Sequence, residues 1–326
     1  MSMTVRAAIV GLGRWGQRLV NSIEGSDKIR IVAGVTRRVE RAQGFADAKG
    51  FPLGADYGAV LADPAIDAVI LATPHSLHAD QVVQAAAAGK QIFCDKPFTL
   101  DRTSAERAVA AAAAAGVTLA VGFNRRFLPA LRQVERLIAA GSLGTLLHVE
   151  AYFSVNAVGR YDDDSWRLDR AEAPGGGLTG LGIHLIDAMI NLLGPIDRVF
   201  AQSTGRVLQE IDDTTSVLFH FRSGAGANLT TLLATPTYFR FHLFGSAAHA
   251  ELRGPDRLEL TRLGDGGAEV TDFPPIDLER AELEAFADAV AGGTSFPVCA
   301  ADAIHGAAVF EAIIRSAASG QPVSVA

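Results

Sequence analysis

The stretch that decides the fold is Ala7-Ala8-Ile9-Val10-Gly11-Leu12-Gly13-Arg14-Trp15-Gly16. It runs from an apolar strand, residues 5–10, into the pattern G-x-G-x-x-G and then into a helix-compatible run that reaches Ile23. The first glycine permits a tight turn, the second lets the backbone approach a pyrophosphate, and the third lets the helix pack on the strand. Free N–H groups at the helix N-terminus bind phosphate oxygens. Because a second strand is expected at residues 29–35, this stretch predicts a dinucleotide site; the alternative is a glycine-rich turn without a ligand.

The residues about 20 positions beyond the last glycine are expected to distinguish NAD from NADP. NAD sites usually have a carboxylate there, which accepts hydrogen bonds from the ribose hydroxyls. This chain instead has Thr36, Arg37 and Arg38 after the second strand. Two guanidinium groups favour a 2′-phosphate, so the sequence predicts NADP as cofactor, with NAD as the second choice. The alternative is that Arg37 and Arg38 are solvated residues at the start of the next helix.

Composition excludes several classes of function. The chain has 326 residues, 49% hydrophobic and 20% charged, which is enough for two domains with hydrophobic cores. Its net charge of −7 argues against a nucleic-acid or anionic-membrane surface, and no apolar run approaches the ~20 residues of a membrane span. The two cysteines, Cys94 and Cys299, have no metal-ligand spacing, so no metal site or disulfide framework is expected. The first strand leaves no room for a leader, so a cytoplasmic location is expected.

Alternating strands and helices predict an α/β domain with a doubly wound parallel sheet, a Rossmann domain, over residues 1–123. A capping box at Thr103-Ser-Ala-Glu106 is expected to open an alanine-rich helix that ends at Gly116. The other elements expected here are strands at 68–72, 91–94 and 118–122 and helices at 40–48 and 77–88.

Residues 124–326 predict an α+β domain with a large, mostly antiparallel open sheet and flanking helices, and the last helices are expected here or packed back on the first domain. A sheet face without helices must meet solvent or another copy of the chain. Apolar residues such as Phe219, Phe221, Leu229 and Leu232 therefore predict a homodimer or homotetramer. The expected strands are 146–153, 198–204, 214–221, 227–233, 239–244, 248–252 and 257–263, and the helices are 128–140, 278–291 and 302–319.

Polar loops follow three of the expected parallel strands. Because ligands of doubly wound sheets lie at the carboxyl ends of the strands, cofactor-binding residues are expected in these loops. For His78 the alternative is a structural role at a helix start. In the second domain a glycine-rich loop, residues 174–182, leads into a helix with His184 and Asp187. The residues expected at the cofactor are Gly11, Leu12, Gly13, Arg14, Trp15, Gly16, Thr36, Arg37, Arg38, Ala72, Thr73, Pro74, His75, His78, Asp95, Lys96, Pro97 and Asn124.

Taken together, these motifs resemble the glucose–fructose oxidoreductase / inositol 2-dehydrogenase / MocA (Gfo/Idh/MocA) family almost from end to end. The resemblance implies NAD(P)-dependent oxidation of a secondary alcohol on a sugar, an inositol or a related polyol. Lys96 matches the essential lysine of the family's Glu-Lys-Pro motif, here Asp-Lys-Pro, and His184 matches its catalytic histidine. The matching stretches are Gly11 to Gly16, Thr73-Pro-x-x-x-His78, Ala88-Gly-Lys-x-x-x-Cys94-Asp-Lys-Pro97, Asn124-Arg-Arg-Phe127, Trp166-Arg167, the triple glycine with His184, and Gly320-Gln-Pro-Val323.

These two assignments agree with the chemistry of the side chains. A histidine titrates near neutral pH and can accept the hydroxyl proton, while a lysine cation stabilises the developing alkoxide. The alternatives are a surface lysine after a strand and a buried helix histidine. One position departs from the family, because Gly180 stands where an aspartate commonly lies four residues before the histidine. An imidazole without that carboxylate is a less well aligned base, and Asp187 is the candidate to replace it unless it faces the core.

The substrate is expected near residues 160–167, where an acidic trio can accept hydrogen bonds from several hydroxyls; a solvated turn is the alternative. Arg126 has the alternative of a buried partner for a carboxylate. Two other functions stay open, namely a nucleotide-bound sensor without turnover and a redox-assisted elimination or glycoside cleavage with a retained cofactor. The expected substrate-binding residues are Lys96, Asn124, Arg126, Tyr161, Asp163, Trp166, Arg167, His184 and Asp187.

Overall fold

The computed structural model describes residues 4–159 and 165–325. It forms two compact units: unit 1 comprises the chain up to Asn124 and Asp277–Ile304, and unit 2 comprises Arg125–Ile276 and the chain from His305. The division falls one residue after the expected boundary, and the segment 277–304 returns to the first unit. Among the described residues no helix is long and apolar enough to cross a membrane, and no group of three or more His, Cys, Asp or Glu side chains is placed to hold a metal ion.

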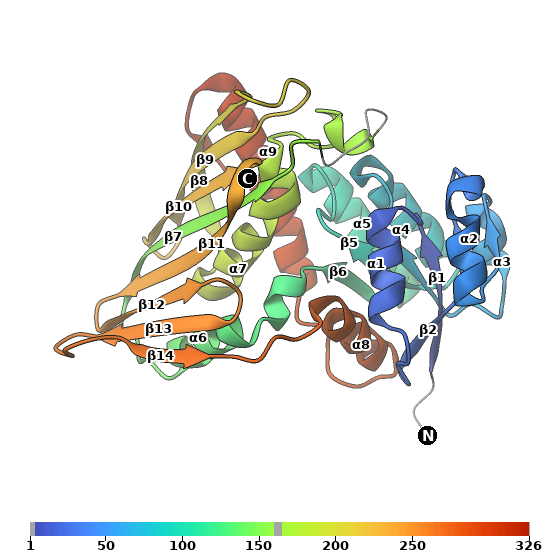
Figure 1. Ribbon diagram of the computed structural model, residues 1–326, viewed down its shortest axis with the longest axis horizontal. Helices are drawn as coiled ribbons and strands as arrows, with labels where there is room; N and C mark the ends of the chain where they lie inside the picture. The colour runs from blue at the N-terminus through green and yellow to red at the C-terminus, as the bar shows by residue number, and fades with distance from the viewer. Residues whose placement is uncertain (1–3, 160–164, 326) are drawn as a thin grey trace. The chain divides into compact units, whose positions relative to one another are not determined.

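Unit 1 contains a six-stranded parallel sheet in the order β3-β2-β1-β4-β5-β6 (Figure 1). This is the doubly wound Rossmann sheet that the alternating pattern predicts. The short elements β3, α3 and η1 were not expected, and α8 was expected in the second domain or packed back on the first. The strands are β1 (Val5–Val10), β2 (Ile29–Val35), β3 (Leu53–Gly54), β4 (Ala68–Leu71), β5 (Gln91–Asp95) and β6 (Leu119–Gly122), and the helices are α1 (Arg14–Ser22), α2 (Val39–Lys49), α3 (Tyr57–Ala62), η1 (His75–Leu77), α4 (His78–Ala87), α5 (Arg102–Ala115) and α8 (Leu278–Val290).

Helices cover both faces of this sheet. On one face, apolar side chains of β1, β4 and β5 pack against α1, α2 and α8 in one core, while α4 and α5 pack against each other on the other face. The capping box expected at Thr103 is wrong, because α5 begins at Arg102. Asp101 is its N-cap residue, and the carboxylate accepts a hydrogen bond from the N–H of Ser104 at 2.8 Å.

Unit 2 contains a nine-stranded sheet in the order β14-β13-β12-β11-β7-β10-β9-β8-β15. All neighbouring strands are antiparallel except β7 and β10, so the expected large, mostly antiparallel sheet is confirmed. The strands are β7 (Leu146–Asn156), β8 (Ile196–Thr204), β9 (Thr214–Phe221), β10 (Gly226–Leu232), β11 (Ala234–Gly245), β12 (Ala248–Arg253), β13 (Arg257–Arg262), β14 (Glu269–Asp272) and β15 (Val323–Ser324), and the helical segments are η2 (Asn124–Phe127), α6 (Pro129–Ala139), η3 (Trp166–Leu168), η4 (Leu178–Gly182), α7 (Ile183–Leu193) and α9 (Ala300–Ser319).

The helices of unit 2 lie on one side of this sheet and leave an open face on the other (Figure 1). Since side chains alternate along a strand, the buried Phe219, Phe221 and Leu229, at 5%, 0% and 1% exposure, face the helices. The expectation that these three form an open apolar surface is therefore wrong. The open face instead carries Leu218, which is 54% exposed, and Leu232.

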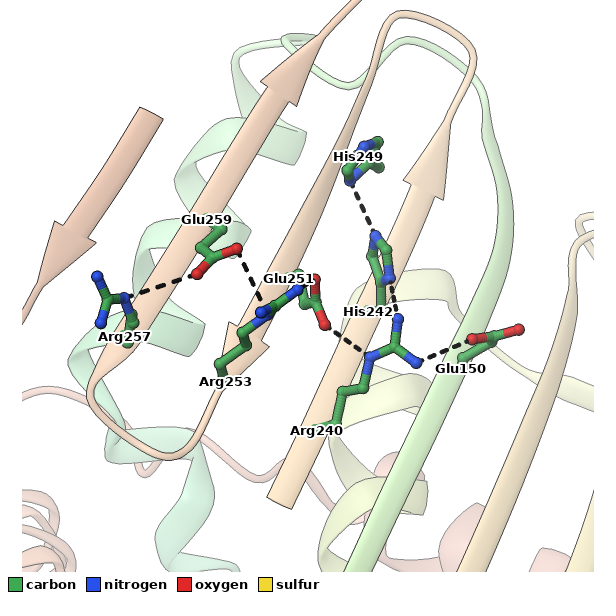
Figure 2. A network of polar contacts seen from close by, with 8 residues as sticks. All are labelled: Glu150, Arg240, His242, His249, Glu251, Arg253, Arg257 and Glu259. Atoms are coloured by element: carbon green, nitrogen blue, oxygen red, sulfur yellow. Dashed lines mark hydrogen bonds and ion pairs between the residues drawn. The ribbon is translucent and has the colours of Figure 1, made fainter. Parts of the chain in front are cut away.

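A polar network crosses the open face from β7 to β13 (Figure 2). Arg240 contacts Glu251 at 2.6 Å and Glu150 at 3.3 Å, and its Nη2 lies 2.8 Å from His242 Nδ1. Because arginine only donates, Nδ1 of His242 accepts, and Nε2 carries the proton and donates to His249 Nδ1 at 2.9 Å. Burial lowers the pKa of His242 to about 4, which keeps this ring neutral at pH 7. The buried members of this network are thus hydrogen-bonded to one another within one chain.

Candidate active site

The glycine loop after β1 has the geometry of a phosphate-binding turn. Gly11 has φ +93°, and a Cβ there would lie 2.5 Å from the carbonyl oxygen of Ala72; a Cβ on Gly16 would collide with the carbonyl of Gly11. Gly13, in contrast, is exposed and has no protein atom within 4 Å of an added Cβ, and it is the N-cap residue of α1 without a side-chain cap. The backbone N–H groups of α1 are therefore open to a pyrophosphate, so the residues present fit a dinucleotide. Leu12 is 2% exposed, so its side chain belongs to the core and only its backbone can face a ligand.

The residues expected to select the cofactor end β2 and begin α2. The N–H of Thr36 donates to the carbonyl of Gly54 at 2.9 Å, so this loop is fixed against β3. Arg37 is exposed at the end of β2, and Arg38 is the half-buried N-cap residue of α2. The position of these two arginines beside the glycine loop agrees with a 2′-phosphate site. Because α2 begins at Val39, the structure also agrees with the alternative that Arg38 only lies at the start of the next helix.

The loops after β4 and β5 leave the sheet at the same level as the glycine loop. The register pairs Val10 with Leu71 and Leu71 with Cys94, so the three strands end together. Lys96 follows β5 directly and is half-buried, and its peptide bond to Pro97 is cis. The expected residues that this edge brings together are Ala72, Thr73, Pro74, His75, Asp95, Lys96 and Pro97.

His78 joins two of these loops. Its side chain is fully buried, with Nδ1 3.0 Å from the carbonyl oxygen of Pro97 and Nε2 3.1 Å from that of Thr73. Burial lowers the pKa of His78. Both ring nitrogens of His78 face backbone carbonyls, which agrees with the alternative of a structural role at a helix start. We therefore do not retain His78 as a cofactor ligand.

In unit 2, His184 lies in the first turn of α7 and is 6% exposed. The preceding segment, η4, is a π-helix, a rare form that occurs mostly as short bulges within α-helices and is frequent at functional sites. Gly176 of the triple glycine has φ +49°, and a Cβ there would collide with the backbone of Asp212, so this loop requires glycine. Gly180 is exposed and has no protein atom within 4 Å of an added Cβ, so this chain has room for the aspartate that it lacks.

Arg126 and Asp187 form a buried ion pair. Nε and Nη2 of Arg126 donate to the two carboxylate oxygens at 2.7 and 2.8 Å, and the side chains are 3% and 4% exposed. Arg126 also donates to Asn191, which donates to Glu135. The alternative that Arg126 is the buried partner of a carboxylate is confirmed. We therefore do not retain Arg126 and Asp187 as substrate contacts. The charge of Asp187 is already neutralised, which makes it a weaker partner for His184 than an aspartate at position 180 would be.

Trp166 and Arg167 lie on η3, and both are half-buried. The guanidinium of Arg167 lies 4.1 Å from the centre of the Trp166 ring, a cation–π contact that orients both side chains. Tyr161, Asp163 and the rest of the acidic trio lie outside the described residues. Lys96 and the glycine loop belong to unit 1, and His184 belongs to unit 2.

Gly13 lies at the N-terminus of α1, directly after a strand of a six-stranded parallel sheet, and leaves open space there, which is typical of a dinucleotide-binding domain. The family model described as "Oxidoreductase family, NAD-binding Rossmann fold" matches residues 5–123, and that of the GFO/IDH/MocA C-terminal domain matches residues 131–251. The chain belongs to the Gfo/Idh/MocA family, which confirms the resemblance of its motifs.

Relatives match over the whole length. D-xylose 1-dehydrogenase (NADP(+)) 2 of Haloferax volcanii is 31% identical and aligns over 97% of this chain and 98% of its own. The scyllo-inositol 2-dehydrogenase (NAD(+)) of Bacillus subtilis is 29% identical over 100% of this chain and 97% of its own. A solved oxidoreductase of Desulfitobacterium hafniense is similar with a TM-score of 0.91 and 28% identity, covering 100% of this chain and 99% of its own.

Proposed function

We propose that this oxidoreductase transfers hydride between NADP and a secondary alcohol, or the corresponding ketone, of a sugar, inositol or related polyol. The observation that carries the proposal is the position of Lys96, which follows β5 at the same sheet edge as the glycine loop. The relatives named for D-xylose and scyllo-inositol support the substrate class. They are named for different cofactors, so the preference for NADP is supported by Arg37 and Arg38 alone.

The roles follow from the chemistry of the side chains. A bound dinucleotide supplies the hydride acceptor. Lys96 holds the substrate oxygen through its ammonium group and stabilises the negative charge that develops there as the hydroxyl loses its proton. His184 accepts that proton as the general base and returns it in the reverse reaction. Gly180, which is exposed, stands at the position where the family commonly has the aspartate that orients this base.

A screen of sugars and inositols with NAD and NADP tests this function. We expect at least one compound to change the absorbance of the nicotinamide band, more strongly with NADP. Binding of a dinucleotide without any such change across the screen would favour the non-catalytic sensor. A dinucleotide that co-purifies and is never released, with product formed but no net NADPH, would favour the elimination or glycoside cleavage.

The preference for NADP is expected to depend on Arg37 and Arg38. The double variant Arg37→Ala/Arg38→Ala loses charge-assisted hydrogen bonds to the 2′-phosphate, so its Kd for NADP should rise about 10- to 100-fold while its Kd for NAD changes little. Fluorescence titration with both dinucleotides measures this. Arg41→Ala, an exposed arginine of the same helix, is the matched control. Equal losses for NADP and NAD, or tighter binding of NAD by the unaltered chain, would contradict the assignment.

We propose a second copy of the chain as the partner of the open face of unit 2. Leu218 is 54% exposed there and pairs with the half-buried Phe200 on the neighbouring strand, and Tyr238 on the same sheet is also 54% exposed. The variant Leu218→Glu places a charge in this apolar area and should shift a dimer or tetramer to monomer by light scattering at micromolar concentration. Val207→Glu, at an equally exposed loop position, should leave the mass unchanged. A monomer in the unaltered chain would contradict the proposal.

A further inference from the structure

Asn124 presents a buried acceptor at the carboxyl edge of the Rossmann sheet. It lies two residues after β6, and the residue is 4% exposed. Its Nδ2 donates to Oε1 of Glu279 at 3.4 Å, whereas Oδ1 is buried and receives no hydrogen bond from any of the described residues. A buried acceptor without a donor is destabilising and calls for an explanation, and a ligand that supplies the donor is such an explanation.

Glu279 determines which end of the amide faces that position. A carboxylate only accepts, so Asn124 must direct Nδ2 toward Glu279 and Oδ1 away from it. The other oxygen of Glu279 accepts from Nη2 of Arg18 at 2.9 Å, and the glutamate is 8% exposed. Two helices of unit 1, α1 through Arg18 and α8 through Glu279, thereby fix the amide in one orientation.

The strand order indicates which part of the dinucleotide lies nearest. The pyrophosphate site is the turn after β1, and Arg37 and Arg38 follow β2 on one side of it. Strands β4, β5 and β6 lie on the other side, so the end of β6 belongs with the nicotinamide half. That half carries three groups that can donate to an amide oxygen, namely two ribose hydroxyls and the carboxamide NH₂.

We propose that Oδ1 of Asn124 accepts a hydrogen bond from the nicotinamide half of the cofactor, and that Glu279 is the positioning residue that holds the amide in this orientation. This inference rests on the proposed function, because it requires that a nicotinamide dinucleotide binds to unit 1.

The variant Glu279→Gln tests the orientation directly. Its amide oxygen stays with Arg18 and its NH₂ turns to Asn124, so Asn124 must rotate and present Nδ2 where the acceptor was. A donor then meets a donor, and the Kd for the dinucleotide, measured by fluorescence titration, should rise about tenfold. Glu284→Gln on the same helix, where the carboxylate contacts Ser26 and Arg280, should leave the Kd unchanged.

A swap of the two groups separates orientation from packing. Asn124→Asp places a second carboxylate against Glu279 and should weaken binding at least as much as Glu279→Gln. In the double variant Asn124→Asp/Glu279→Gln the glutamine NH₂ donates to one aspartate oxygen and the other oxygen is again an acceptor. Its Kd should return to within about threefold of the unaltered chain. Thermal melting without cofactor shows whether each variant is folded.

The 3-acetylpyridine analogue, which lacks the carboxamide NH₂ and keeps both ribose hydroxyls, identifies the donor. If the carboxamide donates, the unaltered chain binds the analogue more weakly than the natural dinucleotide and Glu279→Gln does not distinguish them. If a ribose hydroxyl donates, Glu279→Gln weakens both equally. The inference is overturned if folded Glu279→Gln binds the dinucleotide with an unchanged Kd. It is also overturned if the double variant binds the dinucleotide no more tightly than the weaker-binding of the two single variants. An unaltered chain that binds neither NAD nor NADP overturns the proposed function as well.

Discussion

The variant Lys96→Ala is expected to lower kcat/KM by about three orders of magnitude, and His184→Ala by about two. In the proposed function Lys96 provides a full positive charge for the developing alkoxide, and the sequence has no other cation in the loop of residues 95–101. In the same proposal His184 is the general base, and Gly180 stands where the family commonly has an aspartate. The reaction is therefore expected to gain less from His184 than from Lys96, and solvent is expected to replace His184 in part. Lysine is therefore expected to contribute more to turnover than histidine does.

Steady-state rates with the best substrate of the polyol screen, together with the Kd of the dinucleotide, check this order. Lys49→Ala, a helix lysine paired with Glu24, is the control and should keep full activity. Each variant should bind the dinucleotide within about threefold of the unaltered chain, so that the loss is assigned to the chemical step. A larger loss for His184→Ala than for Lys96→Ala would reverse the two roles.

A variant that introduces a carboxylate at position 180 tests the proposed role of His184 in a second way. A Cβ added at position 180 has no protein atom within 4 Å, so Gly180→Asp meets no obstacle at the first atom of its side chain. The aspartate should orient the imidazole and raise kcat several-fold, and His184→Ala should then cost about tenfold more than it does in the unaltered chain. Equal costs in both backgrounds would show that the carboxylate does not act through His184.

The parts of the site that the sequence predicts are those that a short segment determines by itself. The glycine loop, the strand before it and the helix after it are encoded within residues 5–22, and the alternation of later segments predicts the parallel sheet. Once that sheet is expected, the carboxyl ends of its strands identify the Lys96 loop as one of three candidate loops, while the role of Lys96 within it came from the resemblance to the family. The open, mostly antiparallel sheet is predicted in the same way, from period-two segments separated by turns.

Features that depend on distant residues were missed. Glu279 lies on α8, far from Asn124 in the chain, and nothing in its own helix distinguishes it from a solvated glutamate. The π-helix before α7 was also missed, because it is set by the packing of the glycine loop against other segments rather than by residue periodicity. The face to which Phe219 and Phe221 point was misjudged because alternation shows that two faces differ, not which one the helices cover.

The ion pair between Arg126 and Asp187 is expected to be the most sensitive polar contact of unit 2. The variant Asp187→Asn leaves a charged guanidinium that is 3% exposed without its counter-charge, so the free energy of unfolding should fall by about 3–5 kcal/mol. Glu269→Gln, which removes one partner of an exposed pair in the same unit, should cost less than about 1 kcal/mol. Denaturation in a Trp15→Phe background leaves Trp166 as the only tryptophan and reports on unit 2.

Replacing both partners distinguishes two explanations for this pair. If the ion pair makes unit 2 more stable than apolar residues would, Arg126→Met/Asp187→Leu should remain as unstable as Asp187→Asn. We expect the opposite, because apolar residues of similar size often match or exceed a buried ion pair in stability. The double variant should recover most of the loss and yet reduce kcat, since the pair and its contacts to Asn191 and Glu135 fix α7 in the register that places His184. Full activity in the stable double variant would show that α7 is held in place by apolar packing alone.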